Sequence, residues 1–136
     1  MKVNVSNPKV GRTVQKEVTA DQVGLLVGRK IGQEIDLGPL GFSGAKGVIR
    51  GGSDAQGFPM RPEIQGPVRK RLVIGKGVGL RNAKHGEKKK KTVRGNAVSD
   101  QTAQINIMVT PGTADSCVAA FPEKPKEEKK PEEAKT

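Results

Sequence analysis

The sequence contains neither tryptophan nor tyrosine, and its 136 residues include three phenylalanines, one cysteine and one histidine. A single cysteine excludes an intramolecular disulfide and is typical of a protein from a reducing compartment. One cysteine and one histidine are also too few for a cysteine/histidine zinc site, so we expect no metal. Proteins that read single-stranded bases usually stack them on aromatic side chains, and three scattered phenylalanines argue against that mode of recognition.

Long hydrophobic runs are also missing. No apolar run approaches the roughly 18 residues that a membrane-spanning helix needs, and the start, MKVNVSNPKV, lacks the apolar region of a secretory signal. We therefore expect a soluble, intracellular protein without a membrane partner. The apolar content is 33%, below the usual value of about 45–50%. The core should therefore be built from Val, Ile and Leu.

Positive charge is what the sequence has in excess. There are 25 Lys and Arg against 14 Asp and Glu, which gives a net charge of +11. Residues 123–136 contain five Lys and five Glu, so the excess lies in the rest of the chain. Residues 69–94 alone hold eleven basic residues and one Glu. Such a segment usually faces a polyanion, which can be nucleic acid, anionic lipid or an acidic protein.

Alternating apolar residues predict several short strands separated by turns. We expect strands at residues 3–5, 13–19, 46–50, 69–75, 91–99 and 104–110, with a turn at residues 8–11 between the first two. The predicted fold is mainly β: a small barrel-like or curled antiparallel sheet with one short helix. We predict a β-rich domain over residues 1–121 and a disordered charged tail over residues 122–136, because the tail has few apolar side chains to bury.

The predicted helix begins near Asp21, which is placed to cap its start. Its apolar face would consist of Val23, Leu26, Val27 and Ile31. Glycine recurs every four residues, at Gly24, Gly28 and Gly32. This spacing would give the helix a smooth strip that another backbone can approach, but each interior glycine also costs about 1 kcal/mol relative to alanine. A helix broken within a loop-rich region is equally compatible with the pattern.

Two short motifs suggest enzyme chemistry, and neither is complete. GFSGA, around Ser43, is close to the G-x-S-x-G nucleophile elbow, which requires a strand, a tight turn and a helix. The next residues, KGVIRGG, favour a strand, and the general base would have to be His85 in a lysine-rich segment. GKGVG, at residues 75–79, matches neither of the glycine-rich phosphate-binding motifs. We expect no catalytic residues, no cofactor and no small-molecule substrate.

The basic segment itself has the pattern of a surface that contacts phosphates. Arg69 and Arg71 would share one face of a strand, with Lys70, Leu72 and Ile74 on the other. A run of lysines follows at residues 88–91. Such a run can be a solvated, disordered segment, but the apparent strands around it favour a fixed basic surface. Because the segment repels itself, we expect it to be partly mobile until phosphates neutralise it.

One further stretch, GGSDAQGFPMR at residues 51–61, breaks a simple rule about loops. Its glycines and proline are typical of a loop, yet Phe58, Pro59 and Met60 form an apolar group where a solvated loop should be polar. This stretch closely resembles the family of small-subunit ribosomal protein S-six of the eukaryotic type. The resemblance extends to three later segments, GPVRKRLVIGKGVGLR, HGEKKKKTVRGNAVS and QINIMV. MKVNVSNP resembles the start of that family, so the resemblance covers about residues 1–109.

The resemblance implies a mainly β, barrel-like protein in the cytoplasmic ribosome, bound to small-subunit ribosomal RNA and to neighbouring small-subunit proteins. From the charge pattern together with this resemblance, we expect RNA binding by Lys46, Arg50, Arg61, Arg69, Lys70, Arg71, Lys76, Arg81, Lys84, His85, Lys88, Lys89, Lys90, Lys91 and Arg94. We also expect a structural loop of Gly51, Gly52, Asp54, Gly57, Phe58, Pro59 and Met60. Our hypothesis is that Phe58 and Met60 hold this loop on the protein's own sheet, while Arg61 and Arg50 point to phosphate.

The sequence departs from the eukaryotic members at its end. Those members continue into a long basic helix with regulatory phosphoserines, whereas this chain ends in EKPKEEKKPEEAKT and has no serine after Ser116. The short form therefore resembles archaeal members. The competing hypothesis, a free-standing basic protein that compacts DNA, would satisfy the charge but leaves GGSDAQGFPMR unexplained.

Overall fold

The computed structural model describes residues 1–112 and Phe121. Its elements are β1 (Lys2–Asn7), β2 (Arg12–Glu17), α1 (Ala20–Leu26), β3 (Glu34–Asp36), the 3-10 helix η1 (Gly38–Leu40), β4 (Lys46–Asp54), β5 (Arg69–Ile74), β6 (Lys89–Arg94) and β7 (Thr102–Val109). The fold is mainly β with one short α-helix, as expected. The predicted disordered tail, residues 122–136, lies outside the described residues, and the division of the chain at residue 121 stays a prediction.

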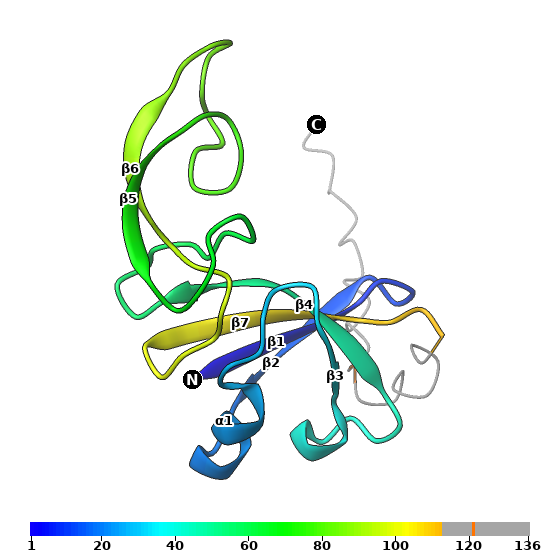
Figure 1. Ribbon diagram of the computed structural model, residues 1–136. Helices are drawn as coiled ribbons and strands as arrows, with labels where there is room; N and C mark the ends of the chain where they lie inside the picture. The colour runs from blue at the N-terminus through cyan, green and yellow to red at the C-terminus, as the bar shows by residue number, and fades with distance from the viewer. Residues whose placement is uncertain (113–120, 122–136) are drawn as a thin grey trace, which may run out of the picture.

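Five strands form the larger sheet, in the order β2-β1-β7-β4-β3. The described strands β2 and β3 each pair with one neighbour and not with each other, so this sheet is not closed into a barrel. The antiparallel prediction is also wrong at one place, because β1 and β7 run parallel. These two strands come from opposite ends of the described chain and lie side by side in the centre of the sheet (Figure 1).

The alternating residues of β1 and β7 form the main hydrophobic core. Val3 and Val5 of β1 and Ile105, Ile107 and Val109 of β7 are each at most 1% exposed. Because side chains alternate between the faces of a strand, these residues all point to the same side of the sheet. Leucines and isoleucines from α1, β3 and η1 complete this core, and two aromatic rings, Phe42 and Phe121, pack in it with centroids 5.7 Å apart.

The helix is shorter than the sequence predicts. It begins after Thr19, whose backbone N–H donates to Oε1 of Gln22 at 3.3 Å. Asp21 therefore lies in the first turn and is not the cap. The helix ends at Leu26, and Gly28 follows with a φ of 83°, in the left-handed region that favours glycine. The glycine strip does not form, and the broken-helix alternative is correct.

Strand β4 continues past its predicted end at residue 50 and includes the first four residues of the predicted loop, 51–54. Its pairing with β7 shifts register between Ile49 and Gly51 and again between Ser53 and Asp54. A Cβ atom on Gly52 would overlap the backbone carbonyl of Gln104 in β7, so only glycine allows the two strands to come this close. The glycines thus permit a bulged strand rather than a solvated loop.

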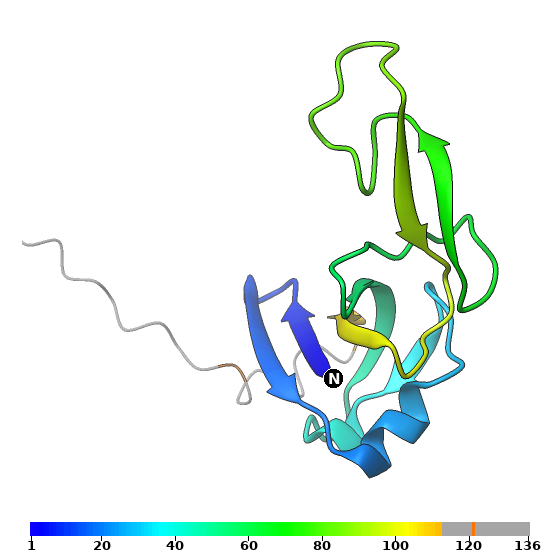
Figure 2. The same ribbon diagram turned by 90° about the vertical axis from the view of Figure 1, so that its left-hand side faces the viewer.

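The remaining strands, β5 and β6, form a separate two-stranded antiparallel sheet. Both views show this ribbon extending away from the five-stranded sheet, with the chain between its strands folding back beside it (Figure 1 and Figure 2). We call residues 69–94 the arm and the five-stranded sheet with α1 and η1 the body. Among the described residues, no helix is long and apolar enough to cross a membrane.

Candidate nucleic-acid interface

The arm displays its cations to solvent. In β5, Lys70 and Arg71 are exposed, and in β6 the lysines at residues 89–91 are exposed. The connecting chain adds further exposed basic side chains, those of Lys76, Arg81, Lys84, His85 and Lys88. The run of lysines is thus largely part of a strand, which begins two residues earlier than predicted and ends at Arg94 rather than Ser99.

One acidic residue lies within the arm and is already paired. Glu87 accepts a hydrogen bond from the backbone N–H of Lys84 at 2.9 Å and forms an ion pair with Nζ of Lys89 at 2.8 Å. The hydrogen bond from Lys89 lowers the pKa of Glu87, with a further contribution from the backbone of Lys84. The glutamate therefore stays ionised and closes the turn before β6, while ten other basic residues of the arm outnumber it.

A short bridging segment, residues 58–61, joins the arm to the body. The backbone N–H of Met60 donates to Gly52 of β4 at 3.0 Å, and that of Asp54 donates to Phe58 at 2.9 Å. On its other side, the segment pairs with β6, because the N–H of Arg94 donates to Pro59 at 2.9 Å. Met60 is 2% exposed and packs in the main core. The apolar group in the predicted loop is thus the connection between two sheets.

Asp54 forms the polar centre of this connection. Its Oδ2 atom accepts from Nη1 of Arg94 at 2.6 Å and also from the guanidinium of Arg69. The side chains of Asp54 and Arg94 are 1% and 2% exposed, whereas that of Arg69 is 32% exposed. Burial raises the pKa of Asp54, but the hydrogen bonds from Arg69 and Arg94 outweigh it and hold the pKa below 3.8.

The guanidinium groups have further partners around Asp54. Arg94 donates to the hydroxyl of Ser99 at 2.6 Å and to Oε1 of Gln101 at 3.2 Å. Arg69 donates to Gln56 at 2.8 Å, and its Cζ atom lies 5.1 Å from the centre of the Phe58 ring. This distance is typical of a cation–π contact. Arg94 of β6 thus contacts β4 through Asp54, the turn before β7 through Ser99 and Gln101, and the bridging segment through Pro59. Strand β5 joins the same cluster because Arg69 also pairs with Asp54.

Comparison with known proteins identifies the family of this chain. Residues 1–119 match the family model described as ribosomal protein S6e. The chain belongs to the ribosomal protein S6e family.

Archaeal relatives of this family are similar over nearly their whole length. The chain is 38% identical to "Small ribosomal subunit protein eS6" of Methanoregula boonei over 130 residues, which covers 96% of this chain and 91% of the relative. It is 40% identical to the protein of the same name from Methanoculleus marisnigri, covering 88% and 91%. For the protein of that name from Haloarcula marismortui the identity is 41%, covering 83% and 88%.

Within this family member, the structure divides the predicted RNA-binding residues into exposed and buried groups. Lys46 and Arg50 of β4 are exposed on the body, and the predicted basic residues between positions 70 and 91 are exposed on the arm. Arg94 is buried against Asp54, so its guanidinium is turned to the protein interior rather than to a phosphate. The side chain of Arg61 is 14% exposed and pairs with Glu63 at 3.0 Å, which leaves Arg50 as the exposed cation of the predicted pair.

Sequence reasoning missed the polar side chains that hold this region together. Asn96 is 6% exposed and accepts from the N–H of Gly66 at 3.2 Å, while its amide donates to Pro62 and Gln65 at 3.3 and 3.2 Å. Gln101 and Ser99 are equally absent from the prediction. The sequence signal for such residues is weak, because a lone polar side chain in a turn-rich stretch is typical of solvent exposure.

The residues that suggested enzyme chemistry, Ser43 and His85, lie in two different connections between strands or helices of the fold. Ser43 is in the turn between η1 and β4, so the residues after it form a strand and not the helix that a nucleophile elbow requires. His85 is in the chain between β5 and β6. Among the described residues, no group of three or more His, Cys, Asp or Glu side chains is placed to hold a metal ion.

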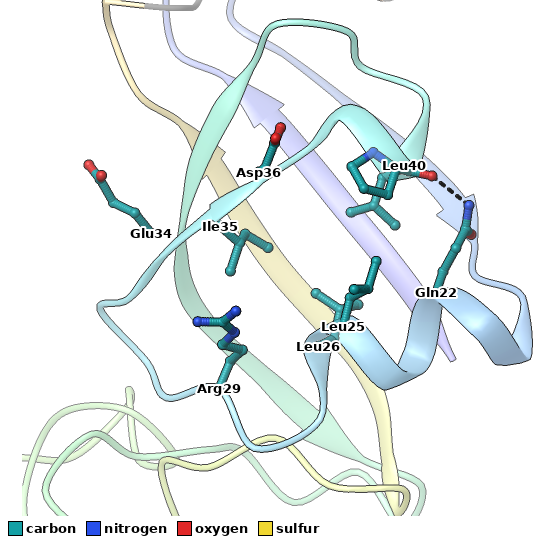
Figure 3. A pocket seen from close by; sticks show the side chains of 9 residues that line it. Gln22, Leu25, Leu26, Arg29, Glu34, Ile35, Asp36 and Leu40 are labelled. Carbon is teal, nitrogen blue, oxygen red and sulfur yellow. Dashed lines mark hydrogen bonds between the residues drawn. The ribbon is translucent and has the colours of Figure 1, made fainter.

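A pocket of about 170 Å³ lies on the body between α1, β3 and η1 (Figure 3). Its apolar lining includes Leu26, Ile35 and Leu40, which belong to the main core, while Leu25 is 54% exposed. The amide of Gln22 donates to the carbonyl of Pro39 at 2.6 Å and closes one side. The exposed side chains of Arg29, Glu34 and Asp36 also line the pocket, and because the two carboxylates outnumber the one cation, it is poorly suited to a polyanion.

Proposed function

We propose that this chain is a structural constituent of the small ribosomal subunit that supports translation by binding ribosomal RNA, mainly through the arm. The observation that carries the proposal is the match of residues 1–119 to the ribosomal protein S6e family, whose curated relatives bear the name of a small-subunit protein. In this role the protein works by binding, next to other proteins of the subunit, and not by catalysis.

The arm supports the RNA-binding part of the proposal by its charge and exposure. Phosphates attract exposed Lys and Arg without regard to base identity, and each contact releases counterions. The residues we propose to face RNA are Lys70, Arg71, Lys76, Arg81, Lys84, His85, Lys88, Lys89, Lys90 and Lys91, with Lys46 and Arg50 on the body. Arg69, Arg94 and Arg61 contribute by fixing the arm to the body.

The alternative of a free-standing DNA-compacting protein is not supported. The relatives that this chain matches over most of its length are named as small-subunit ribosomal proteins. The net charge is compatible with either function. The match to the ribosomal protein family is what distinguishes the ribosomal role from DNA compaction.

Sedimentation tests the proposal. A tagged full-length chain would be expressed in an archaeal host, and the lysate would be run through sucrose gradients at moderate and at high salt, with an added free basic protein as the control. We expect the chain to stay with the small subunit at the salt concentration that strips the control protein from the particles. A chain that returns to the top of the gradient with the control, or that follows chromosomal DNA, would overturn the proposal.

A further inference from the structure

The two faces of the arm ribbon differ in what covers them. In the β5–β6 register, Arg71 lies opposite Thr92 and Val73 lies opposite Lys90. Directly opposite residues of an antiparallel pair point to the same side. Arg69 and Arg94 share this side at the base of the ribbon, where both pair with Asp54. We call the rest of this side the open face and define it by Arg71, Val73, Lys90 and Thr92. The other side carries Lys70, Leu72, Ile74, Lys89, Lys91 and Val93.

The chain between β5 and β6 packs on that second side, which we call the covered face. Ile74 and Val93 are 5% and 0% exposed and form a small cluster with Leu80 and Ile64. A Cβ atom on Gly79 would lie 3.3 Å from Ile74, which shows how closely the connecting chain approaches the ribbon. The covered face is therefore occupied by the protein itself at Ile74 and Val93, while its lysines remain exposed.

The open face keeps a large apolar side chain in solvent. Val73 is 64% exposed, more than any other large hydrophobic residue found exposed in the described part of the chain. It lies between exposed cations, because Lys90 is directly opposite and Arg71 is two residues away on the same strand. Arg71 and Lys90 are diagonal neighbours, about 7–8 Å apart at their backbones. An apolar centre flanked by two cations is suited to a partner that is anionic and partly apolar.

We propose that the open face lies on the backbone of double-helical RNA, with Arg71 and Lys90 on phosphates and Val73 against the sugars between them. This inference rests on the proposed function and assigns the RNA-binding side of the arm. Duplex RNA exposes a wide, shallow minor groove lined by sugars and phosphates, which proteins recognise by shape. Single-strand binding relies on aromatic platforms, and residues 69–94 contain no Phe, Tyr or Trp.

The register of the ribbon provides a matched control. Lys70 and Lys91 are also exposed and are also diagonal neighbours on β5 and β6, but they belong to the covered face. The double variants Arg71→Gln/Lys90→Gln and Lys70→Gln/Lys91→Gln therefore remove the same charge from the same part of the arm. All four side chains are exposed, so neither variant should unfold the protein, and circular dichroism would verify this.

Binding of the full-length protein to a fluorescent RNA duplex would be measured by anisotropy over a series of salt concentrations. We expect the open-face variant to lose affinity about tenfold or more, and its slope of log K against log salt to fall by about 2, one for each lost phosphate contact. The covered-face variant should lose about twofold or less with little change in slope. Val73→Ala should weaken binding a few-fold and leave the slope unchanged.

Equal losses of affinity in the two double variants, or a larger loss in the covered-face variant, would overturn the face assignment. The proposed function would still stand in that case if the wild-type protein sediments with the small subunit. Tighter binding to a single strand of the same sequence would overturn the choice of duplex RNA. Failure of the wild type both to bind RNA and to sediment with the subunit would instead overturn the proposed function itself.

Discussion

In the body, Ile105 and Ile107 of β7 are 0% and 1% exposed, whereas in the arm Leu72 and Val73 of β5 are 38% and 64% exposed. Each strand has an antiparallel neighbour, β4 for β7 and β6 for β5. The alternating residues of β7 build a core, whereas those of β5 leave charged side chains exposed. Burial of apolar area is the main source of stability. The comparison therefore places most of the buried apolar area in the body and the exposed charge that we propose to bind RNA in the arm, with Asp54 joining the two.

The largest effect should come from a core substitution in the body. Ile107→Ala removes buried methyl groups from the centre of the five-stranded sheet and should lower the free energy of unfolding by about 4 kcal/mol, within the range of about 2–5 kcal/mol for such changes. Val73→Ala, in the arm, should cost less than about 0.5 kcal/mol. Urea denaturation of both variants measures this, and similar costs would contradict the division between body and arm.

The next largest effect should come from the link between the two regions. Asp54→Asn leaves the buried guanidinium of Arg94 without its counterion and should cost about 3 kcal/mol, at the lower end of the range for breaking a buried pair. Glu63→Gln removes the exposed partner of Arg61 and is a control that should cost less than about 1 kcal/mol. A cost for Asp54→Asn no greater than the control's would show that the buried cluster does not hold the arm.

Acid should weaken the same link. The pKa of Asp54 is lower in the folded protein than its ordinary value of 3.8, so its contribution to stability is complete above that value and is lost as the pH falls through the folded pKa. The difference in melting temperature between wild type and Asp54→Asn should be constant at neutral pH and shrink below about pH 4. A difference that stays the same at low pH would mean that Asp54 is not the group responsible.

A smaller effect is expected at the bridging segment. Phe58→Ala removes the ring beneath the Arg69 guanidinium and should cost about 1–2 kcal/mol, including a cation–π contribution. It should also loosen the arm and weaken incorporation into the subunit. Phe58→Leu keeps much of the apolar volume and isolates the aromatic contribution. Unchanged stability and unchanged incorporation in Phe58→Ala would contradict the role we assign to this residue.

The sequence alone predicts the local features of both regions well. The alternation of Val3 and Val5, and of Ile105, Ile107 and Val109, identifies strands and their buried faces correctly, because one buried face imposes a period of two. The opposite faces of Arg71 and Leu72 are also predicted correctly. Strand β3 is missed because three residues are too few for a period to be recognised.

Long-range features could not be predicted in the same way. The parallel pairing of β1 with β7 joins residues about a hundred positions apart, and local periodicity carries no information on such pairing. The pair of Asp54 and Arg94 is separated by 40 positions. In the sequence Arg94 looks like one more cation of the basic segment, because the residue type reveals its charge but not its burial.

Hydrogen exchange on the full-length protein, free and within the small subunit, tests the comparison of body and arm most directly. Amides of β1 and β7 should exchange slowly in both states, because a large core protects them. Amides of β5 and β6 should exchange rapidly in the free protein, where the charges repel one another, and slowly in the subunit, where phosphates neutralise them. Equally slow exchange of β5 and β6 in both states would contradict the account.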